Sequence, residues 1–263
     1  MSPDIAFVVA LVIKMLATAG IVVAASLIAE RTGPMIGSLV ATLPVSAGPA
    51  FVFLSLDQGP PFIAAAALAG FVATIGTILF ATVYAIVAQR QRMIISLLCA
   101  HATWLTFAFG SRFFDWTLGR ATLLAIVVFS TAIVLTRPLR HVPMPPPKRR
   151  WYDVPLRAGM VSTLVLVVVS VSNIFGSYVT GILAAFPVVF TSLSLILHPR
   201  VGGPPTAAVL AHSMIGMIGF ELALAILHLT ALPLGSPLAL TLALAICIGW
   251  NLTLFTIRRR RIT

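Results

Sequence analysis

Long apolar runs separated by short polar turns follow one another along the whole chain. A helix of about 20 apolar residues crosses the hydrocarbon core of a bilayer, and each run has about that length. The pattern therefore predicts an all-α, polytopic integral membrane protein with about nine transmembrane helices. The predicted spans are 5–29, 34–56, 61–88, 93–111, 119–136, 154–175, 178–197, 205–229 and 236–257.

One stretch of the chain is repeated. Gly33-Pro-Met-Ile-Gly-Ser-Leu-Val-Ala-Thr-Leu-Pro44 returns as Gly176-Ser-Tyr-Val-Thr-Gly-Ile-Leu-Ala-Ala-Phe-Pro187, a shift of 143 residues (176 − 33). The same register continues without a gap to residue 76. The first-copy residues that meet an identical residue are Gly33, Ala41, Pro44, Val45, Gly59, Pro61, Ala64, Ala65 and Gly76. Glycines and prolines that match in ungapped register indicate an internal duplication.

The duplication predicts two halves of opposite orientation. The first repeat, 1–136, contains five predicted spans and the second, 154–257, contains four, with a basic, proline-rich linker at 137–153 and a basic tail at 258–263. Because five is an odd number, the second repeat enters the membrane from the opposite side. Two inverted-topology repeats of this kind are typical of secondary transporters, whose site lies near the bilayer midplane at the repeat interface.

The composition supports a membrane environment and an orientation. Hydrophobic residues make up 60% of the chain and charged residues 9%, yet the net charge is +11. With the C-terminal tail in the cytoplasm, fourteen Lys and Arg residues fall in inside loops and only Arg112 and Arg120 in outside loops. By the positive-inside rule, this bias predicts a multi-pass protein of a bacterial inner (cytoplasmic) membrane, with the N-terminus outside. The basic residues lie between apolar spans and form no polar face, which excludes nucleic acid as a partner.

The residues that usually carry enzyme chemistry do not form a recognisable pattern. Cys99 and Cys247 both lie inside apolar runs without metal-ligand spacing, so they are expected to be small buried hydrophobes. The chain has no GxSxG, HExxH, phosphate-binding loop or paired-carboxylate motif. We therefore expect no enzymatic activity, no catalytic residue, no metal and no cofactor.

Two prolines near the middle of repeated spans mark the candidate site. Pro44 and Pro187 each remove a backbone donor, which frees a carbonyl oxygen that must find another partner in lipid. One alternative is a kink at a tight helix contact, because small residues share the face of each proline. The other is a pair of broken helices that line a central cavity. In this second case the candidate hydrogen-bonding residues are Thr42, Ser46, Thr191 and Ser192.

Three ionisable residues inside predicted spans are further candidates. Lys14 lies nine to ten residues into the first span, where a cation is costly. It is either a counter-charge for an anionic ligand or the partner of a carboxylate. Glu221 is the only carboxylate within a span, so it is the natural partner or a proton carrier. His101 is either a hydrogen-bonded interior residue or a proton relay.

The stretch Ala29-Glu-Arg-Thr-Gly-Pro-Met-Ile-Gly-Ser-Leu-Val-Ala-Thr-Leu-Pro-Val-Ser46 resembles short bacterial inner-membrane proteins of the GlpM-like type. In those proteins a first span ends in a basic turn, and a Gly-x-Leu-x-Ala-x-Leu-Pro span follows. The resemblance implies that each half of this chain corresponds to one such protein, so that a dimer has been fused into one chain. It implies no substrate, because the family has no settled activity.

These features predict a transporter or permease for a small solute. The positive charge of Lys14 favours an anionic solute. The lipid bilayer and the solute are the expected partners, and a homo-oligomer is left open. The first alternative is a membrane scaffold or assembly protein that holds a soluble partner with its basic linker. The second is a lipid flippase, which requires a lateral opening between helices.

Overall fold

The computed structural model describes residues 3–31, 47–142 and 150–260 of the chain. Every element within these ranges is a helix. The helices are α1 (Pro3–Arg31), α3 (Ala47–Asp57), α4 (Pro60–Val87), α5 (Met93–Ser111), α6 (Leu118–Leu135), η1 (Arg137–His141), α7 (Asp153–Ala184), α8 (Val188–Val201), α9 (Gly203–Leu234) and α10 (Ser236–Arg260). Among the described residues, α4, α5, α6, α7, α9 and α10 are long and apolar enough to cross a membrane. The chain is therefore an all-helical, polytopic membrane protein, as predicted.

The apolar pattern located most of these helices correctly. Seven predicted spans each fall on one helix, and no predicted end lies more than one residue outside that helix. The span 34–56 begins outside the described residues, and its described part is α3. The span 178–197 is wrong as a single helix, because the chain leaves the helical path at residues 185–187 between α7 and α8.

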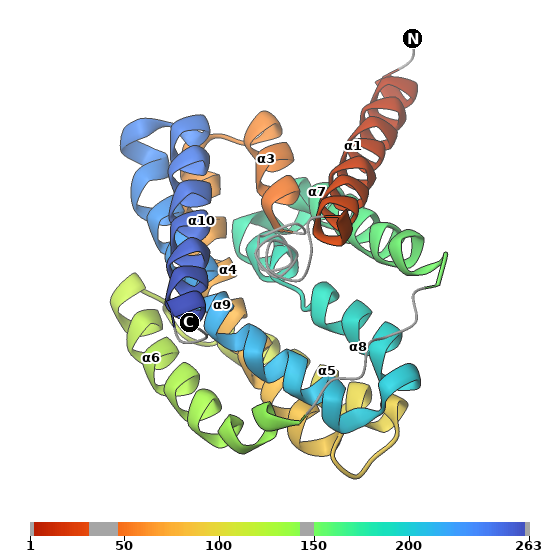
Figure 1. Cartoon of the computed structure of the whole chain (residues 1–263). Coiled ribbons are helices and arrows are strands. Elements are labelled where there is room, and N and C mark those ends of the chain that lie inside the picture. Colours follow the sequence, from red (N-terminus) through yellow and green to blue (C-terminus); the bar gives the residue numbers. More distant parts are fainter. Residues whose placement is uncertain (1–2, 32–46, 143–149, 261–263) are drawn as a thin grey trace.

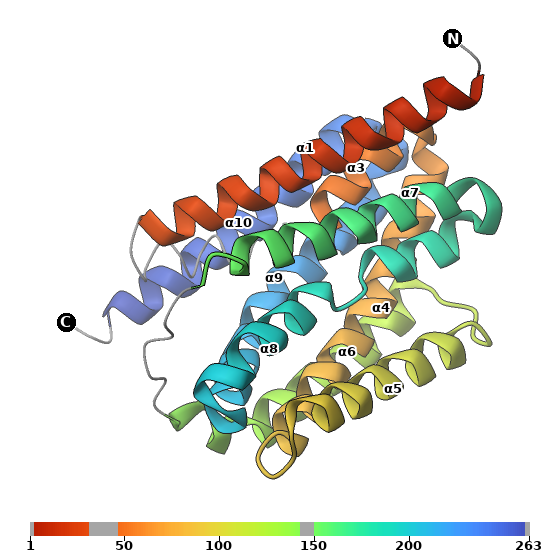
Figure 2. The same cartoon turned by 90° about the vertical axis from the view of Figure 1, so that its right-hand side faces the viewer.

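Helix α7 consists of two helical parts that meet at Gly176. This glycine has φ 72° and ψ −176°, a conformation that is essentially restricted to glycine. Figure 2 shows the chain running to one end of the molecule in the first part of α7, turning sharply, and running back in the second part. Gly176 therefore forms the turn that the sequence predicted between the spans 154–175 and 178–197.

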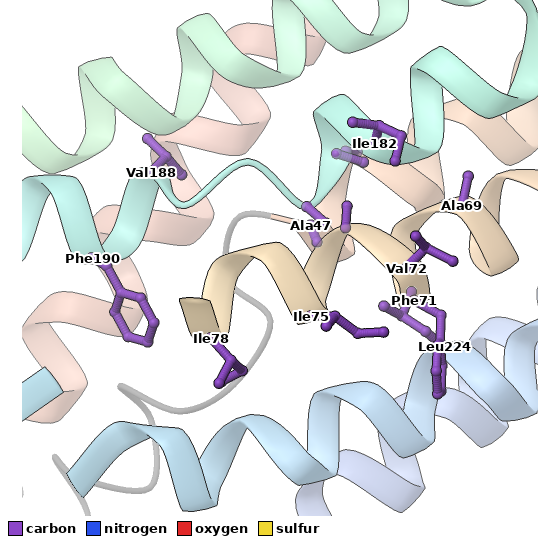
Figure 3. Packing of buried hydrophobic residues seen from close by; sticks show 14 of the residues in the cluster. Ala47, Ala69, Phe71, Val72, Ile75, Ile78, Ile182, Val188, Phe190 and Leu224 are labelled. Carbon is purple, nitrogen blue, oxygen red and sulfur yellow. The ribbon is translucent and has the colours of Figure 1, made fainter. Parts of the chain in front are cut away.

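Helix α4 lies in the middle of the bundle and contacts α5, α6, α7 and α9. In its most apolar 18-residue window, 78% of the residues are buried, against 17% for α5 and 22% for α6. Figure 3 shows apolar side chains of α4, including Val72, Ile75 and Ile78, among residues from α7, α8 and α9. The core therefore forms around α4, while few residues of α5 and α6 are buried.

Helices α4 and α9 contact each other more extensively than any other pair of described helices. They run antiparallel. Ala64 of α4 accepts a hydrogen bond from His228 near the end of α9, and Ala88, the C-cap of α4, lies against Gly203 at the start of α9. Between these contacts, Gly70 lies against Leu224. Helices α1 and α7 also run in opposite directions where they lie along one another (Figure 2).

Candidate functional site

The centre of the candidate site is the break between α7 and α8. Helix α7 ends at Ala184, and Val188 is the first residue of α8, with Pro187 as its N-cap residue. Figure 3 shows the extended segment that joins the two helices between Ile182 and Val188. Of the two alternatives for Pro187, a kink in a continuous helix and a broken helix, the structure contains the broken helix. Proline has no backbone N–H with which to continue a helix.

A hydroxyl group of α4 binds the backbone at this break. The shortest hydrogen bond of Thr77 is donated to the carbonyl oxygen of Ala185, at 3.0 Å. A carbonyl released from a helix in an apolar environment needs such a partner. Close by, Gly181 of α7 lies directly against the backbone carbonyl of Ala66 in α4, so the small residue here allows the two backbones to touch. Helix α4 thus supports the break from one side.

His101 of α5 reaches the break from another side. Its Nε2 atom lies 3.1 Å from the hydroxyl oxygen of Thr191, and its Nδ1 atom lies 2.9 Å from the carbonyl oxygen of Leu97. The Thr191 hydroxyl also lies 2.8 Å from the carbonyl oxygen of Pro187. The structure therefore connects three predicted residues, His101, Thr191 and Pro187, in one hydrogen-bonded chain.

The protonation state of His101 decides the direction of these hydrogen bonds. A neutral imidazole that donates from Nδ1 to Leu97 has an accepting Nε2 atom, so the Thr191 hydroxyl must donate to it. A protonated imidazole donates from both nitrogens, and Thr191 is then free to donate to Pro187. The ring lies among aromatic side chains, with Phe80 at 4.9 Å and Phe186 at 5.6 Å between centroids. Protonation of His101 would therefore change the hydrogen bonding of one hydroxyl group at the break, that of Thr191.

Glu221 lies on α9, where that helix contacts α4. Its side chain is buried between α9 and α4, and the hydroxyl group of Thr74 lies beside its carboxyl group. Neither carboxyl oxygen has a hydrogen-bond partner among the described residues, and the Thr74 hydroxyl donates to the carbonyl of Gly70. Thr74 and Thr77 are one turn apart and share a face of α4, so Glu221 and the break lie about one turn apart along that helix.

Lys14 forms an ion pair with Asp57. The expectation that Glu221 is its natural partner is wrong, because the long Lys14 side chain extends to the C-terminal end of α3, where Asp57 lies. Gln58 and Asn173 are hydrogen-bonded at the same end of the molecule, at 2.6 Å. Of the two alternatives for Lys14, the structure contains the carboxylate partner.

A second ion pair lies at the other end of the bundle. Arg200, at the end of α8, binds Asp153, at the start of α7. The Arg200 guanidinium also lies over the Tyr152 ring, 5.5 Å from its centroid. A hydrogen bond from the exposed Arg150 lowers the pKa of the Tyr152 hydroxyl below its usual value of 10.

The remaining predicted residues do not join this arrangement. Ser192 is buried, but its hydroxyl donates to Val189 on its own helix, and it points about 100° away from its neighbour Thr191. Thr42, Pro44 and Ser46 lie outside the described residues. Within the described part of the chain, no group of three His, Cys, Asp or Glu residues could hold a metal ion.

Sequence reasoning missed Tyr84 and His198. The Tyr84 hydroxyl lies 2.7 Å from His198 Nδ1 and joins α4 to α8. One signal was present: Pro187, Thr191, Ser194 and His198 recur at spacings of four, three and four residues, which places them on one helical face. Periodicity alone gave no indication that Tyr84 of α4 would face them.

Comparison of the chain with models of protein families, with curated proteins and with solved structures gives no match.

Proposed function

We propose that the chain is a bacterial inner-membrane secondary transporter or permease, and that it moves a small solute past the break between α7 and α8. The observation that carries the proposal is the break itself, which lies beside the central helix α4. Backbone groups and the His101–Thr191 pair meet there. Irregular backbone at membrane depth is tolerated where it is buried in protein or lines a cavity, and transporters use it to bind their substrates.

Helix boundaries support the proposed duplication. Helices α4 and α9 begin 143 residues apart (203 − 60), and so do α5 and α10 (236 − 93). Contacts recur at the same shift: Gly76 lies against Phe107, and Gly219 lies against Trp250. Because 107 and 250 also differ by 143, the two halves share helix boundaries and a packing contact.

The directions of the helices support inversion of the two halves. In Figure 1, α3 runs from the centre of the molecule towards one end, and α8 runs from the centre towards the other. Residues 47–57 shifted by 143 fall within α8, so these two helices correspond in the proposed repeats. Their opposite directions are what an inverted repeat requires.

Glu221 and His101 are the groups that we assign to proton handling. Glu221 is a buried carboxyl without a hydrogen-bond partner among the described residues, and intramembrane carboxyl groups mark proton and ion pathways. His101 can carry a proton directly beside the break. With the N-terminus outside, the Lys14–Asp57 pair lies at the outer end and the Asp153–Arg200 pair at the inner end.

Reconstitution of the full chain into proteoliposomes tests the proposal. Small carboxylates and inorganic phosphate are applied under an imposed pH gradient, and charge movement is recorded on a solid-supported membrane. We expect a solute-dependent current that Glu221→Gln abolishes, while Asp115→Asn, which removes an exposed carboxylate, leaves it unchanged. If no solute of the panel moves and a soluble partner binds the basic linker instead, the scaffold alternative replaces this proposal.

A further inference from the structure

One face of α8 carries a line of polar side chains from the helix break to the end of the helix. Pro187, Thr191, Ser194 and His198 occupy positions i, i+4, i+7 and i+11, which share a face. Thr191 faces His101 of α5, and His198 faces Tyr84 of α4. The face therefore lies inside the bundle, and it begins where the candidate site is.

The members of this line are shielded from solvent along most of its length. Ser194 and Tyr84 are 0% exposed, and Thr191 is buried as well. His198 is only partly buried. Two residues beyond it, the Arg200–Asp153 ion pair marks the end of α8. One end of the line is thus enclosed beside His101, and the other end approaches the charged end of the helix.

Ser194 occupies the central position, and no described protein group forms a hydrogen bond of normal geometry with its hydroxyl. That hydroxyl faces the hydroxyl of Tyr84. A fully buried hydroxyl without a protein partner is rare, and such a group commonly binds an ordered water. Thr191 precedes Ser194 by one turn and His198 follows it by one turn, so a water at Ser194 would connect the two ends.

The line exists in only one half of the chain. The residues 143 positions before Thr191, Ser194 and His198 are Gly48, Phe51 and Ser55. The corresponding residues of the partner helices also differ, because Leu227 corresponds to Tyr84 and Leu244 to His101. A feature needed only for packing would be expected in both halves, whereas a path to one side of the membrane would not.

We propose that Thr191, Ser194, Tyr84 and His198, with one water molecule at Ser194, conduct protons between His101 and the aqueous phase at the end of α8. Hydroxyl, phenol and imidazole groups can each donate and accept a proton. The Thr191 hydroxyl rotates from the Pro187 carbonyl towards the water. The Nε2–H bond of His101 then breaks as Thr191 accepts that proton, and the original hydroxyl proton of Thr191 passes to the water. The water then passes a proton through Ser194 and Tyr84 to His198, which releases one to bulk water. The use of this path in transport rests on the proposed function, but the path itself is tested separately.

Proton exchange between the histidine rings and water tests the path. The full chain is labelled with 15N-histidine, reconstituted without any solute, and exchange of the ring N–H protons with water is measured by NMR. The His101 signal is assigned from a His101→Gln sample. We expect Tyr84→Phe and Ser194→Val to slow exchange at His101 at least tenfold. In Ser194→Val, exchange at His198 should remain within about twofold of the wild type.

Tyr178→Phe is the matched control, because the Tyr178 hydroxyl binds Ser111 and lies off the line; it should leave exchange at His101 unchanged. Unchanged exchange at His101 in both Tyr84→Phe and Ser194→Val would overturn the path, and so would the absence of exchange on the scale of seconds in the wild type. If one variant does not fold, the other decides. Because no solute is present, failure of the transport assay and failure of the path are distinguishable.

Discussion

Lys14 of α1 forms an ion pair with Asp57 at the end of α3, although the two residues are 43 positions apart. The Lys14 side chain is 16% exposed and that of Asp57 is 35% exposed, so Lys14 is the more shielded partner. A shielded cation depends on its counter-charge more than an accessible anion does. The pair therefore predicts an asymmetric response to removal of either partner.

We expect Asp57→Leu to lower the free energy of unfolding by about 2 kcal/mol, because it leaves the Lys14 ammonium without a partner. Lys14→Met should cost about 1 kcal/mol or less, because Asp57 can then turn to water. The double variant should be more stable than Asp57→Leu alone. Equilibrium unfolding in mixed detergent micelles gives all three values, and a double-mutant cycle without coupling would contradict the prediction.

Gly76 and Gly219, which are 143 positions apart, are predicted to respond differently to the same substitution. A Cβ at Gly76 would lie 2.7 Å from Cδ1 of Phe107, whereas a Cβ at Gly219 would lie 2.7 to 2.9 Å from three atoms of Trp250, including its own Cβ. The Trp250 indole also donates a hydrogen bond to Ile215, at 3.0 Å. Phe107 can rotate away, but Trp250 has no such freedom without losing that bond.

Gly219→Ala should therefore lower the free energy of unfolding by about 1–3 kcal/mol through overpacking. Gly76→Ala should be close to neutral, because the gain in helix propensity of about 1 kcal/mol offsets the smaller clash. Thermal unfolding of both variants in the same detergent measures the difference. An equal loss in the two variants would show that Phe107 is held as firmly as Trp250.

Much of the fold could be predicted because a membrane helix needs a long apolar run, and because glycine and proline mark its ends. Gly176 and Pro187 were both identified from the repeat. What could not be predicted depends on distant contacts. The partner of Lys14 lies in the turn after α3, and Tyr84 meets His198 only because α4 and α8 pack together. The difference between a kink and a complete break at Pro187 also depends on the support that Thr77 gives to Ala185.

Glu221→Gln is predicted to leave the fold almost unchanged. The carboxyl oxygens have no hydrogen-bond partner among the described residues, so the substitution removes no hydrogen bond, and the two side chains have nearly the same shape. We expect the free energy of unfolding to change by less than about 1 kcal/mol. Loss of proton-coupled transport with a normal melting temperature would then show a functional role, whereas a large loss of stability would indicate a structural one.

Substitution of Gly176 and of Gly159, both in α7, distinguishes the effect of backbone strain on stability from the effect of packing. Neither glycine has an atom within 4 Å of the position that a Cβ would occupy, but only Gly176 has a positive φ, of 72°. Gly176→Ala should lower the free energy of unfolding by about 1–3 kcal/mol, because its backbone region is essentially closed to L-residues. Gly159→Ala lies in regular helix and should raise it by up to about 1 kcal/mol. Unfolding of the two variants under identical conditions gives the comparison. A neutral Gly176→Ala would mean that the chain can turn at this point without a left-handed residue, and that the return of α7 towards the break does not depend on it.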